Sequence, residues 1–319
     1  MTLTCMREGI HQDADSTSLI SGCDSIIFDC DGVLIDVSKS YDMAINGTVK
    51  HILGEFGIKG IMHADQHTIQ GFKHTGGFND EVDLTYGIIL GIAAANKMHV
   101  DQREFIASVI ANSDESGISS AQRYIKSVAD ISDVIEKLDY PGTHAQNMLY
   151  QTFDQIFYGS SLYKKIYNAE PTIMGPGLIN QDMLLVNETL LDILDKRFAA
   201  MAILTGRGMI PARYSLGSLL DRFDIQGSMF LEDHPRSLAK PNPESLQRVM
   251  DKINSESCMY VGDSMEDLIM AKRAISLGRN VVFCGILGNN PERLPLFERG
   301  GAQLAIESIS MLPKVLNLE

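Results

Sequence analysis

Two carboxylates stand two residues apart directly after a short apolar run. The run is Ser25-Ile26-Ile27-Phe28, and Asp29-Cys30-Asp31-Gly32-Val33 follows it. A β-branched and aromatic stretch of this length is typical of a buried strand, and the glycine indicates a turn. Because side chains alternate along an extended backbone, we expect Asp29 and Asp31 to point the same way. One carboxylate could then attack as a nucleophile while the other transfers protons, and such oxygen ligands suit Mg²⁺. The alternative is a solvated acidic turn.

Three later segments also place polar residues beside apolar runs. They are Ala202-Ile203-Leu204-Thr205-Gly206-Arg207, then Lys240-Pro241-Asn242-Pro243, then Met259-Tyr260-Val261-Gly262-Asp263 with Asp267 four residues later. In order and residue type, the four segments together resemble the motifs of the haloacid dehalogenase superfamily, in its phosphatase branch. The resemblance covers about residues 23–39 and 176–319.

This resemblance implies roles for the first two carboxylates. Asp29 would be the nucleophile that forms an aspartyl-phosphate, which splits hydrolysis into two easier steps. Asp31 would protonate the leaving oxygen and then activate water. The dehalogenases of the superfamily lack an acid at the second position, so Asp31 favours phosphate ester chemistry over carbon–halogen cleavage.

The later motifs imply a metal site. Asp263 would bind Mg²⁺ directly, beside Asp29 and the backbone carbonyl of Asp31. Asp267 would hold a water on the metal or orient Lys240. As an alternative, Asp263 could be an acid that precedes a helix and is favoured there by the helix dipole.

The remaining motif residues imply a phosphate site. Thr205 and the amide of Gly206 would hydrogen-bond the phosphoryl oxygens, since glycine allows close backbone approach. Lys240 would stabilise the charge that develops on phosphorus. Arg207 could bind the phosphoryl group too, or it could pair with an acid of the protein.

Alternating strand and helix patterns over residues 181–319 predict a three-layer α/β/α, Rossmann-like core with a parallel sheet. We expect strands at 200–204, 228–231, 258–261 and 281–284, and helices at 181–197, from Pro211, at 243–253 and at 264–277. In such a sheet the ligand sits beyond the carboxyl ends of the strands, where Asp29, Thr205 and Asp263 fall.

Residues 40–175 are predicted to be an all-α insertion that resembles the helical, C1-type cap of one subgroup of the superfamily. We expect helices at 41–56, 80–96, 103–111, 119–138 and 144–158. The loop from Lys73 to Asp80 holds two glycines among polar side chains, which suits a loop that closes over a ligand. Lys73 and Asn79 are its candidate substrate contacts. A flexible surface turn would explain the same residues.

The composition limits the expected partners and cellular location of the protein. The 319 residues carry a formal net charge of −14, which argues against nucleic acid or an anionic membrane as the main partner. Residues 1–22 are predicted to be a polar, mobile tail without the pattern of a secretory signal, and no apolar run is long enough to span a membrane. The five cysteines lack metal-ligand spacing and suit a reducing cytoplasm.

The expected function is a cytoplasmic, Mg²⁺-dependent phosphatase of a small phosphorylated metabolite, such as a sugar phosphate or a phosphoglycolate-like compound. A phosphomutase is the nearest alternative, because its first half-reaction is the same. A non-catalytic phosphometabolite-binding protein is a further alternative. Neither the substrate nor the oligomeric state follows from the sequence.

Overall fold

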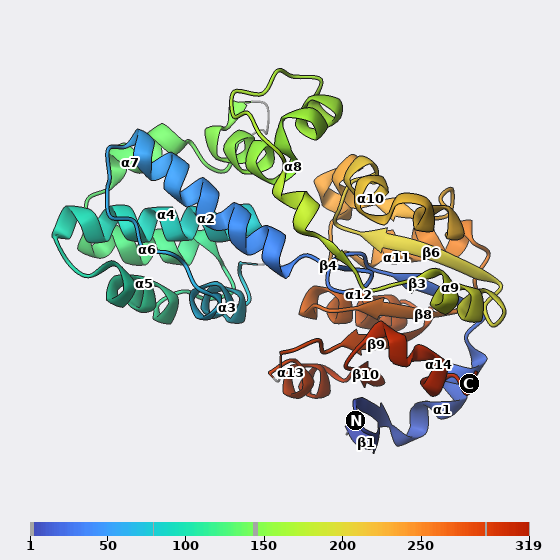
Figure 1. Cartoon of the computed structure of the whole chain (residues 1–319). Helices are drawn as coiled ribbons and strands as arrows, with labels where there is room; N and C mark the ends of the chain where they lie inside the picture. Colours follow the sequence, from blue (N-terminus) through green and yellow to red (C-terminus); the bar gives the residue numbers. More distant parts are fainter. Residues whose placement is uncertain (1–2, 79, 143–145, 291, 319) are drawn as a thin grey trace. The chain divides into compact units, whose positions relative to one another are not determined.

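The structure, a computed structural model, describes residues 3–78, 80–142, 146–290 and 292–318. The chain divides into two compact units, one formed by Met1–Val37 with Asp182–Glu319 and the other by Ser38–Gln181. Both units can be followed by colour in Figure 1. The sequence predicts limits of 40 and 175 for the inserted domain.

Among the described residues, the first unit holds an eight-stranded sheet in the order β1-β2-β10-β9-β8-β3-β6-β7 (Figure 1). All strands from β10 to β7 in this order run parallel, and β2 and β1 continue the sheet in antiparallel fashion. The strands are β1 (Leu3–Arg7), β2 (Ile10–Asp13), β3 (Ser25–Phe28), β6 (Ala200–Thr205), β7 (Met229–Phe230), β8 (Ser257–Gly262), β9 (Asn280–Ile286) and β10 (Leu304–Ile306).

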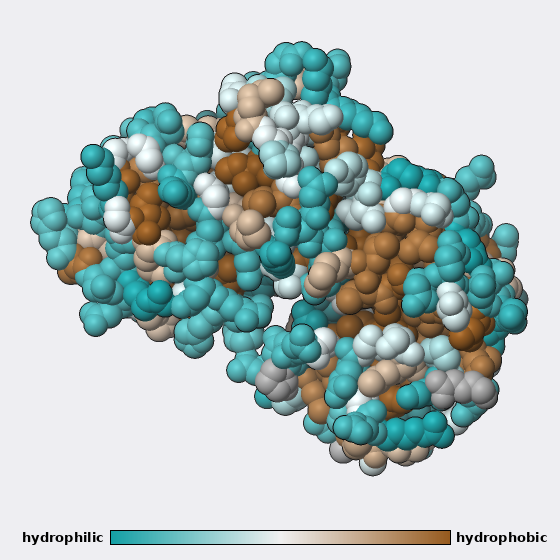
Figure 2. Space-filling model, viewed as in Figure 1, coloured by the Kyte–Doolittle hydropathy of each residue, from teal (hydrophilic) through white to brown (hydrophobic). Residues whose placement is uncertain are grey.

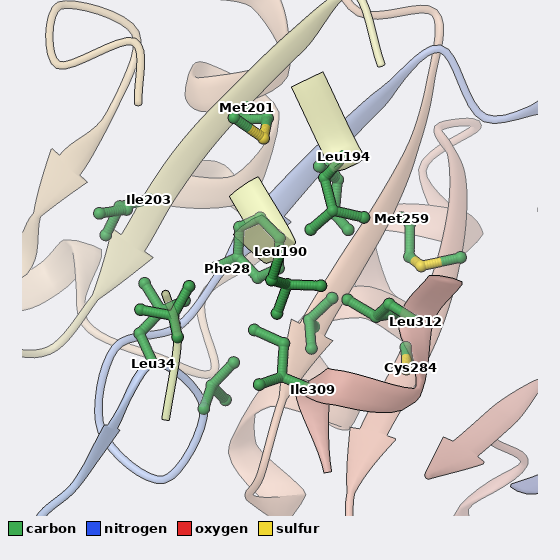
Figure 3. Packing of buried hydrophobic residues seen from close by; sticks show 14 of the residues in the cluster. Phe28, Leu34, Leu190, Leu194, Met201, Ile203, Met259, Cys284, Ile309 and Leu312 are labelled. Carbon is green, nitrogen blue, oxygen red and sulfur yellow. The ribbon is translucent and has the colours of Figure 1, made fainter. Parts of the chain in front are cut away.

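Hydrophobic residues cover both faces of this sheet. On β3, Ile26 and Phe28 belong to one buried cluster, whereas Ile27 belongs to another. Figure 3 shows Phe28 in the first cluster among Leu190, Leu194 and Ile309. The first cluster includes residues of α1 (Thr17–Gly22), α9 (Glu188–Asp195), α10 (Met209–Leu216) and α14 (Leu312–Val315), and the second those of α11 (Pro243–Lys252), α12 (Met265–Ser276) and α13 (Arg293–Gly300). A parallel sheet buried on both faces confirms the predicted α/β architecture.

The prediction of a mobile tail at residues 1–22 is wrong. Within it, β1 and β2 form a hairpin, and β2 pairs with β10 so that Ile10 lies opposite Ile306. The side chains of Ile10 and Ile20 are buried in the core. These few apolar residues stand far apart in a polar segment, so no periodic pattern shows that the segment completes a sheet edge.

The predicted helix at 181–197 is also shorter than expected. Residues Met183–Leu184 instead form β5, which pairs antiparallel with β4 (Ile35–Asp36). The helix α9 begins only at Glu188, because the side chain of Asn187 accepts a hydrogen bond from the Leu190 amide and caps it. Leu184 and Leu185, which lie in the segment predicted to be helical, are exposed.

The surface of the molecule carries hydrophobic areas, shown in brown in Figure 2, among mostly hydrophilic residues.

In the described part of the second unit, every regular element is a helix. These are α2 (Ser38–Glu55), α3 (Gln66–His74), α4 (Glu81–Met98), α5 (Gln102–Ala111), α6 (Ile118–Val128), α7 (Ser132–Leu138) and α8 (Met148–Tyr167). The helix predicted at 119–138 is thus broken in two, with Ala129 in an extended conformation after α6. The unit is built around α4, whose residues from Leu84 to Ala95 are all buried. None of the helices in the described residues is long and apolar enough to cross a membrane.

Candidate active site

Three neighbouring strands of the first unit deliver the motif residues to one edge of the sheet. β3 lies between β8 and β6, and Phe28 stands opposite both Val261 and Ile203. Asp29 follows β3, Thr205 ends β6, and Asp263 follows β8. Since the strands are parallel, these ends meet where α/β proteins bind ligands.

Asp29 is 8% exposed and held in place by its neighbours. Its amide donates to the carbonyl of Val261 at 2.9 Å, and its Oδ1 accepts from the Cys30 amide at 2.7 Å. The other oxygen, Oδ2, lies 2.9 Å from Nζ of Lys240. Burial raises the pKa of Asp29 to about 7; Lys240 opposes this rise, and the neighbouring carboxylates add to it.

Lys240 is shared between two carboxylates. Its Nζ lies 2.7 Å from Oδ1 of Asp267 as well as 2.9 Å from Oδ2 of Asp29, and the side chain is nearly buried. Burial alone would lower the pKa of Lys240, but Asp267 and Asp29 raise it well above its usual value. The ammonium therefore stays charged next to the candidate nucleophile.

Asp267 is fully buried and accepts hydrogen bonds at both oxygens. Besides Lys240, Oδ1 accepts from the hydroxyl of Tyr260 at 2.7 Å, and Oδ2 accepts from the hydroxyl and the amide of Ser264 at 2.7 and 3.1 Å. The Ser264 contacts form a capping box that begins α12. A Cβ at Gly262 would overlap Asp267, so the glycine is needed at this position. These partners favour the prediction that Asp267 orients Lys240. Sequence reasoning missed Tyr260 and Ser264.

Three carboxylates form a cluster that could hold a metal ion. Oxygens of Asp29, Asp263 and Asp267 all lie within 4.8 Å of one another. Because four protein donors contact the oxygens of Asp267, whereas only the Cys30 amide and Lys240 contact those of Asp29, we expect direct coordination to fall to Asp29, Asp263 and the carbonyl of Asp31. A purely oxygen donor set fits a hard cation such as Mg²⁺.

Asp263 has a fixed orientation. Its Oδ2 accepts from Nη2 of Arg293 at 2.8 Å, and Arg293 also donates to the carbonyl of Ile286. Gly32 lies against the same carboxylate with a φ of +74°, and a Cβ at Gly32 would overlap Oδ2 of Asp263. Arg293 is a further residue of this site that no motif indicated.

Asp31 contacts the buried guanidinium of Arg207. Nε of Arg207 lies 2.8 Å from Oδ1 of Asp31, while its Nη1 lies 2.9 Å from Oδ2 of Asp182. The same Nη1 donates to the hydroxyl of Ser215 at 2.8 Å. Of the two readings of Arg207, this geometry favours pairing with protein acids over binding substrate. Asp182 and Ser215 were missed from the sequence.

Thr205 and Gly206 differ in exposure. The hydroxyl of Thr205 is buried and accepts from the Arg207 amide at 3.2 Å. Gly206 is exposed, and no atom of the described residues lies within 4 Å of the position that a Cβ would take. A ligand could therefore reach the Gly206 backbone, and phosphate binding by both residues stays a prediction.

The second unit holds the two remaining candidates. Lys73 lies in the last turn of α3 rather than in a loop, and its Nζ is 3.0 Å from Oε1 of Glu81. The expected loop thus begins only at Thr75 and ends at Asp80, whose side chain caps α4. Asn79 lies outside the described residues. Substrate binding by Lys73 and Asn79 stays a prediction.

Comparison with known proteins agrees with this site. Residues 181–274 match the family model of haloacid dehalogenase-like hydrolases. Among solved structures, phosphatase Tt82 from Thermococcus thioreducens covers 91% of this chain and 98% of its own, at 19% identity and a TM-score of 0.57. A predicted phosphoglycolate phosphatase from Haemophilus somnus covers 92% and 97%, at 13% identity and a TM-score of 0.49. A haloacid dehalogenase-superfamily hydrolase of subfamily IA from Geobacter sulfurreducens covers 92% and 96%, at 16% identity and a TM-score of 0.43. No curated protein matches the sequence.

Residues 181–274 of the core are similar to those of haloacid dehalogenase-like hydrolases. The matched segment contains Thr205, Lys240, Asp263 and Asp267, and the structure brings the last three together with Asp29, which precedes the segment. The predicted family is thereby confirmed. At 19% identity, the Thermococcus structure shows a shared fold only, so the substrate has to be argued from this chain's own site.

Proposed function

We propose that this hydrolase is a Mg²⁺-dependent phosphatase of small phosphorylated metabolites and works through an aspartyl-phosphate on Asp29. The observation that carries the proposal is the position of Asp29, directly after β3, in contact with a charged, buried Lys240 and within 4.8 Å of the carboxylate of Asp263. The name of the Thermococcus phosphatase, whose fold is shared, supports the same reaction class. The free thiols of all five cysteines support a cytoplasmic location.

In the first half-reaction, a carboxylate oxygen of Asp29 forms a bond to phosphorus as the bond to the leaving oxygen breaks. Asp31 gives its proton to that leaving oxygen. Lys240, fixed by Asp267, balances the negative charge around the phosphoryl group. Thr205 and the Gly206 amide would bind the phosphoryl oxygens.

In the second half-reaction, water attacks the phosphorus of the aspartyl-phosphate while Asp31 takes a proton from it. Inorganic phosphate leaves and Asp29 is regenerated. Mg²⁺, held by Asp29, Asp263 and the Asp31 carbonyl, would neutralise phosphoryl charge and orient the phosphoryl group.

The test is a screen of the purified protein against a panel of phosphorylated metabolites, with inorganic phosphate as the readout. We expect turnover that requires Mg²⁺ and stops when a strong chelator is added. Full activity with the chelator would exclude the metal, and no turnover on any ester would exclude the phosphatase. An isomerised sugar phosphate formed without release of phosphate would indicate a mutase instead.

A further inference from the structure

Arg207 lies in a setting unlike that of an arginine that binds substrate. Its side chain is only 2% exposed, and its guanidinium contacts three protein groups. Nε faces Oδ1 of Asp31, whereas Nη1 faces both Asp182 and Ser215. Because the guanidinium is buried, it is not open to an incoming phosphate in this conformation.

Asp182 anchors the far side of this guanidinium. Its side chain is 4% exposed, and its Oδ2 accepts from the hydroxyl of Ser215 at 2.8 Å as well as from Arg207. Asp182 directly precedes β5, and Ser215 lies on α10. Because the guanidinium is rigid and planar, fixing Nη1 in this way also fixes the direction of Nε.

The carboxylate that forms an ion pair with Nε, that of Asp31, follows a strand on a tight turn. The carbonyl of Cys30 accepts hydrogen bonds from the amides of Val33, Leu34 and Ile35 at 3.2, 2.8 and 2.9 Å. This turn fixes the backbone of Asp31, but its side chain is 25% exposed and needs a separate restraint. A carboxylate held through Oδ1 presents Oδ2 in one direction.

We propose that Arg207 and Asp182 are positioning residues that hold the carboxylate of Asp31 in line for proton transfer. The inference rests on the proposed function, in which Asp31 is the acid and base. Burying a charge is costly unless it is well paired. The buried guanidinium of Arg207 is paired with two carboxylates, those of Asp31 and Asp182. Correct alignment of a proton donor contributes to the rate without adding binding energy.

The test compares the wild type with Asp182→Asn and Arg207→Lys on two substrates. An alkyl phosphate needs the proton of Asp31 to leave, whereas 4-nitrophenyl phosphate has a good leaving group. We expect kcat/KM for the alkyl phosphate to fall by about tenfold to hundredfold, and kcat/KM for 4-nitrophenyl phosphate to change little. Because the second step still needs Asp31 as a base, a burst of 4-nitrophenolate should precede slow turnover.

The matched control is Arg213→Gln, which breaks an exposed pair between α10 and Asp221 in the same unit and should leave activity on both substrates unaffected. Adding Asp182→Asn to Asp31→Asn should cause no further loss, since both act on one group. Equal losses on both substrates in Asp182→Asn and Arg207→Lys, or a raised KM with unchanged kcat, would overturn the inference while leaving the phosphatase intact. A wild type without activity would overturn the proposed function and the inference with it.

Discussion

Asp29 can attack phosphorus only as an ionised carboxylate. Some of its neighbours favour this ionised form and others favour the protonated form. Burial raises the pKa of Asp29 to about 7, and Asp267, Asp263 and Asp31 add to the rise. Lys240 alone does not restore the pKa to its usual value. A divalent cation beside Asp29 and Asp263 would add positive charge where the cluster lacks it. The metal would therefore favour the ionised nucleophile as well as bind the phosphoryl group.

The substitution Asp29→Asn should abolish turnover with little effect on folding. The amide cannot form a phosphoryl bond, but it keeps the shape of the side chain, and Lys240 retains its contact with Asp267. The measurement is phosphate release, with thermal unfolding as the control for structure. Hydrolysis at the wild-type rate would exclude the covalent mechanism.

Substitutions of Asp263 and Asp267 should affect different properties, metal affinity for Asp263 and stability for Asp267. Asp263→Asn removes a direct ligand and should raise the Mg²⁺ concentration needed for activity. Asp267→Asn should instead lower the free energy of unfolding, by about 1.5 to 3 kcal/mol, since it weakens the buried hydrogen bonds from Tyr260 and Ser264 to the carboxylate, although Lys240 keeps its contact with Asp29. Denaturant midpoints and Mn²⁺ binding, measured on both variants, separate the two effects. Equal changes in metal affinity would mean that Asp267 is a ligand too.

At the scale of elements, the apolar runs that end in motif residues were predictable, and the short edge elements were not. β6, β8 and β9 each contain the strand expected from their β-branched and aromatic residues. In contrast, β4 and β5 are two residues each, too short for any periodicity, and they form only because their partner strand is close in the fold. α3 was missed because one glycine and two histidines among its nine residues make its sequence resemble a loop, although Asp65 caps it.

The side chains that orient the motif residues could not be predicted for a related reason. Arg207 pairs with Asp182, and Asp263 pairs with Arg293, across separations in the sequence that no local pattern encodes. Tyr260 is part of a predicted strand, but its hydroxyl bond to Asp267 depends on how α12 leaves that strand. The motifs identify the groups that react, and the fold supplies the groups that hold them.

The turn after β3 should require glycine at position 32. Gly32 has a φ of +74° and lies against Asp263, so Gly32→Ala should lower both metal affinity and stability. Gly278→Ala is the matched control, because Gly278 has a φ of +89° in the same unit and no described atom within 4 Å of a Cβ position. The control measures the backbone cost alone, of roughly 1 kcal/mol. If both variants bound Mn²⁺ alike, the close approach of Gly32 to Asp263 would have no role in the site.

At the scale of the whole molecule, the two units suggest separate functions, chemistry in one and substrate selection in the other. The first unit contains Asp29, Lys240 and Asp263, so the proposed chemistry needs nothing from Ser38–Gln181. The net charge of −14 would repel phosphate esters in general, and the buried cations of the first unit offset it only locally. We therefore propose that the helical unit selects among substrates.

Lys73→Ala tests this division. If Lys73 contacts the substrate, kcat/KM for the native metabolite should fall about tenfold, which corresponds to a contact worth about 1.4 kcal/mol. Activity on acetyl phosphate, a mixed anhydride, should change little, since its leaving group, acetate, is too small to offer the contacts of a metabolite. The control is Lys97→Ala, which removes an exposed pair with Asp133 from the same unit. Equal losses of activity on both substrates would show that Lys73 has only a structural role, through its pair with Glu81. No loss on either substrate would show that Lys73 does not contact the substrate.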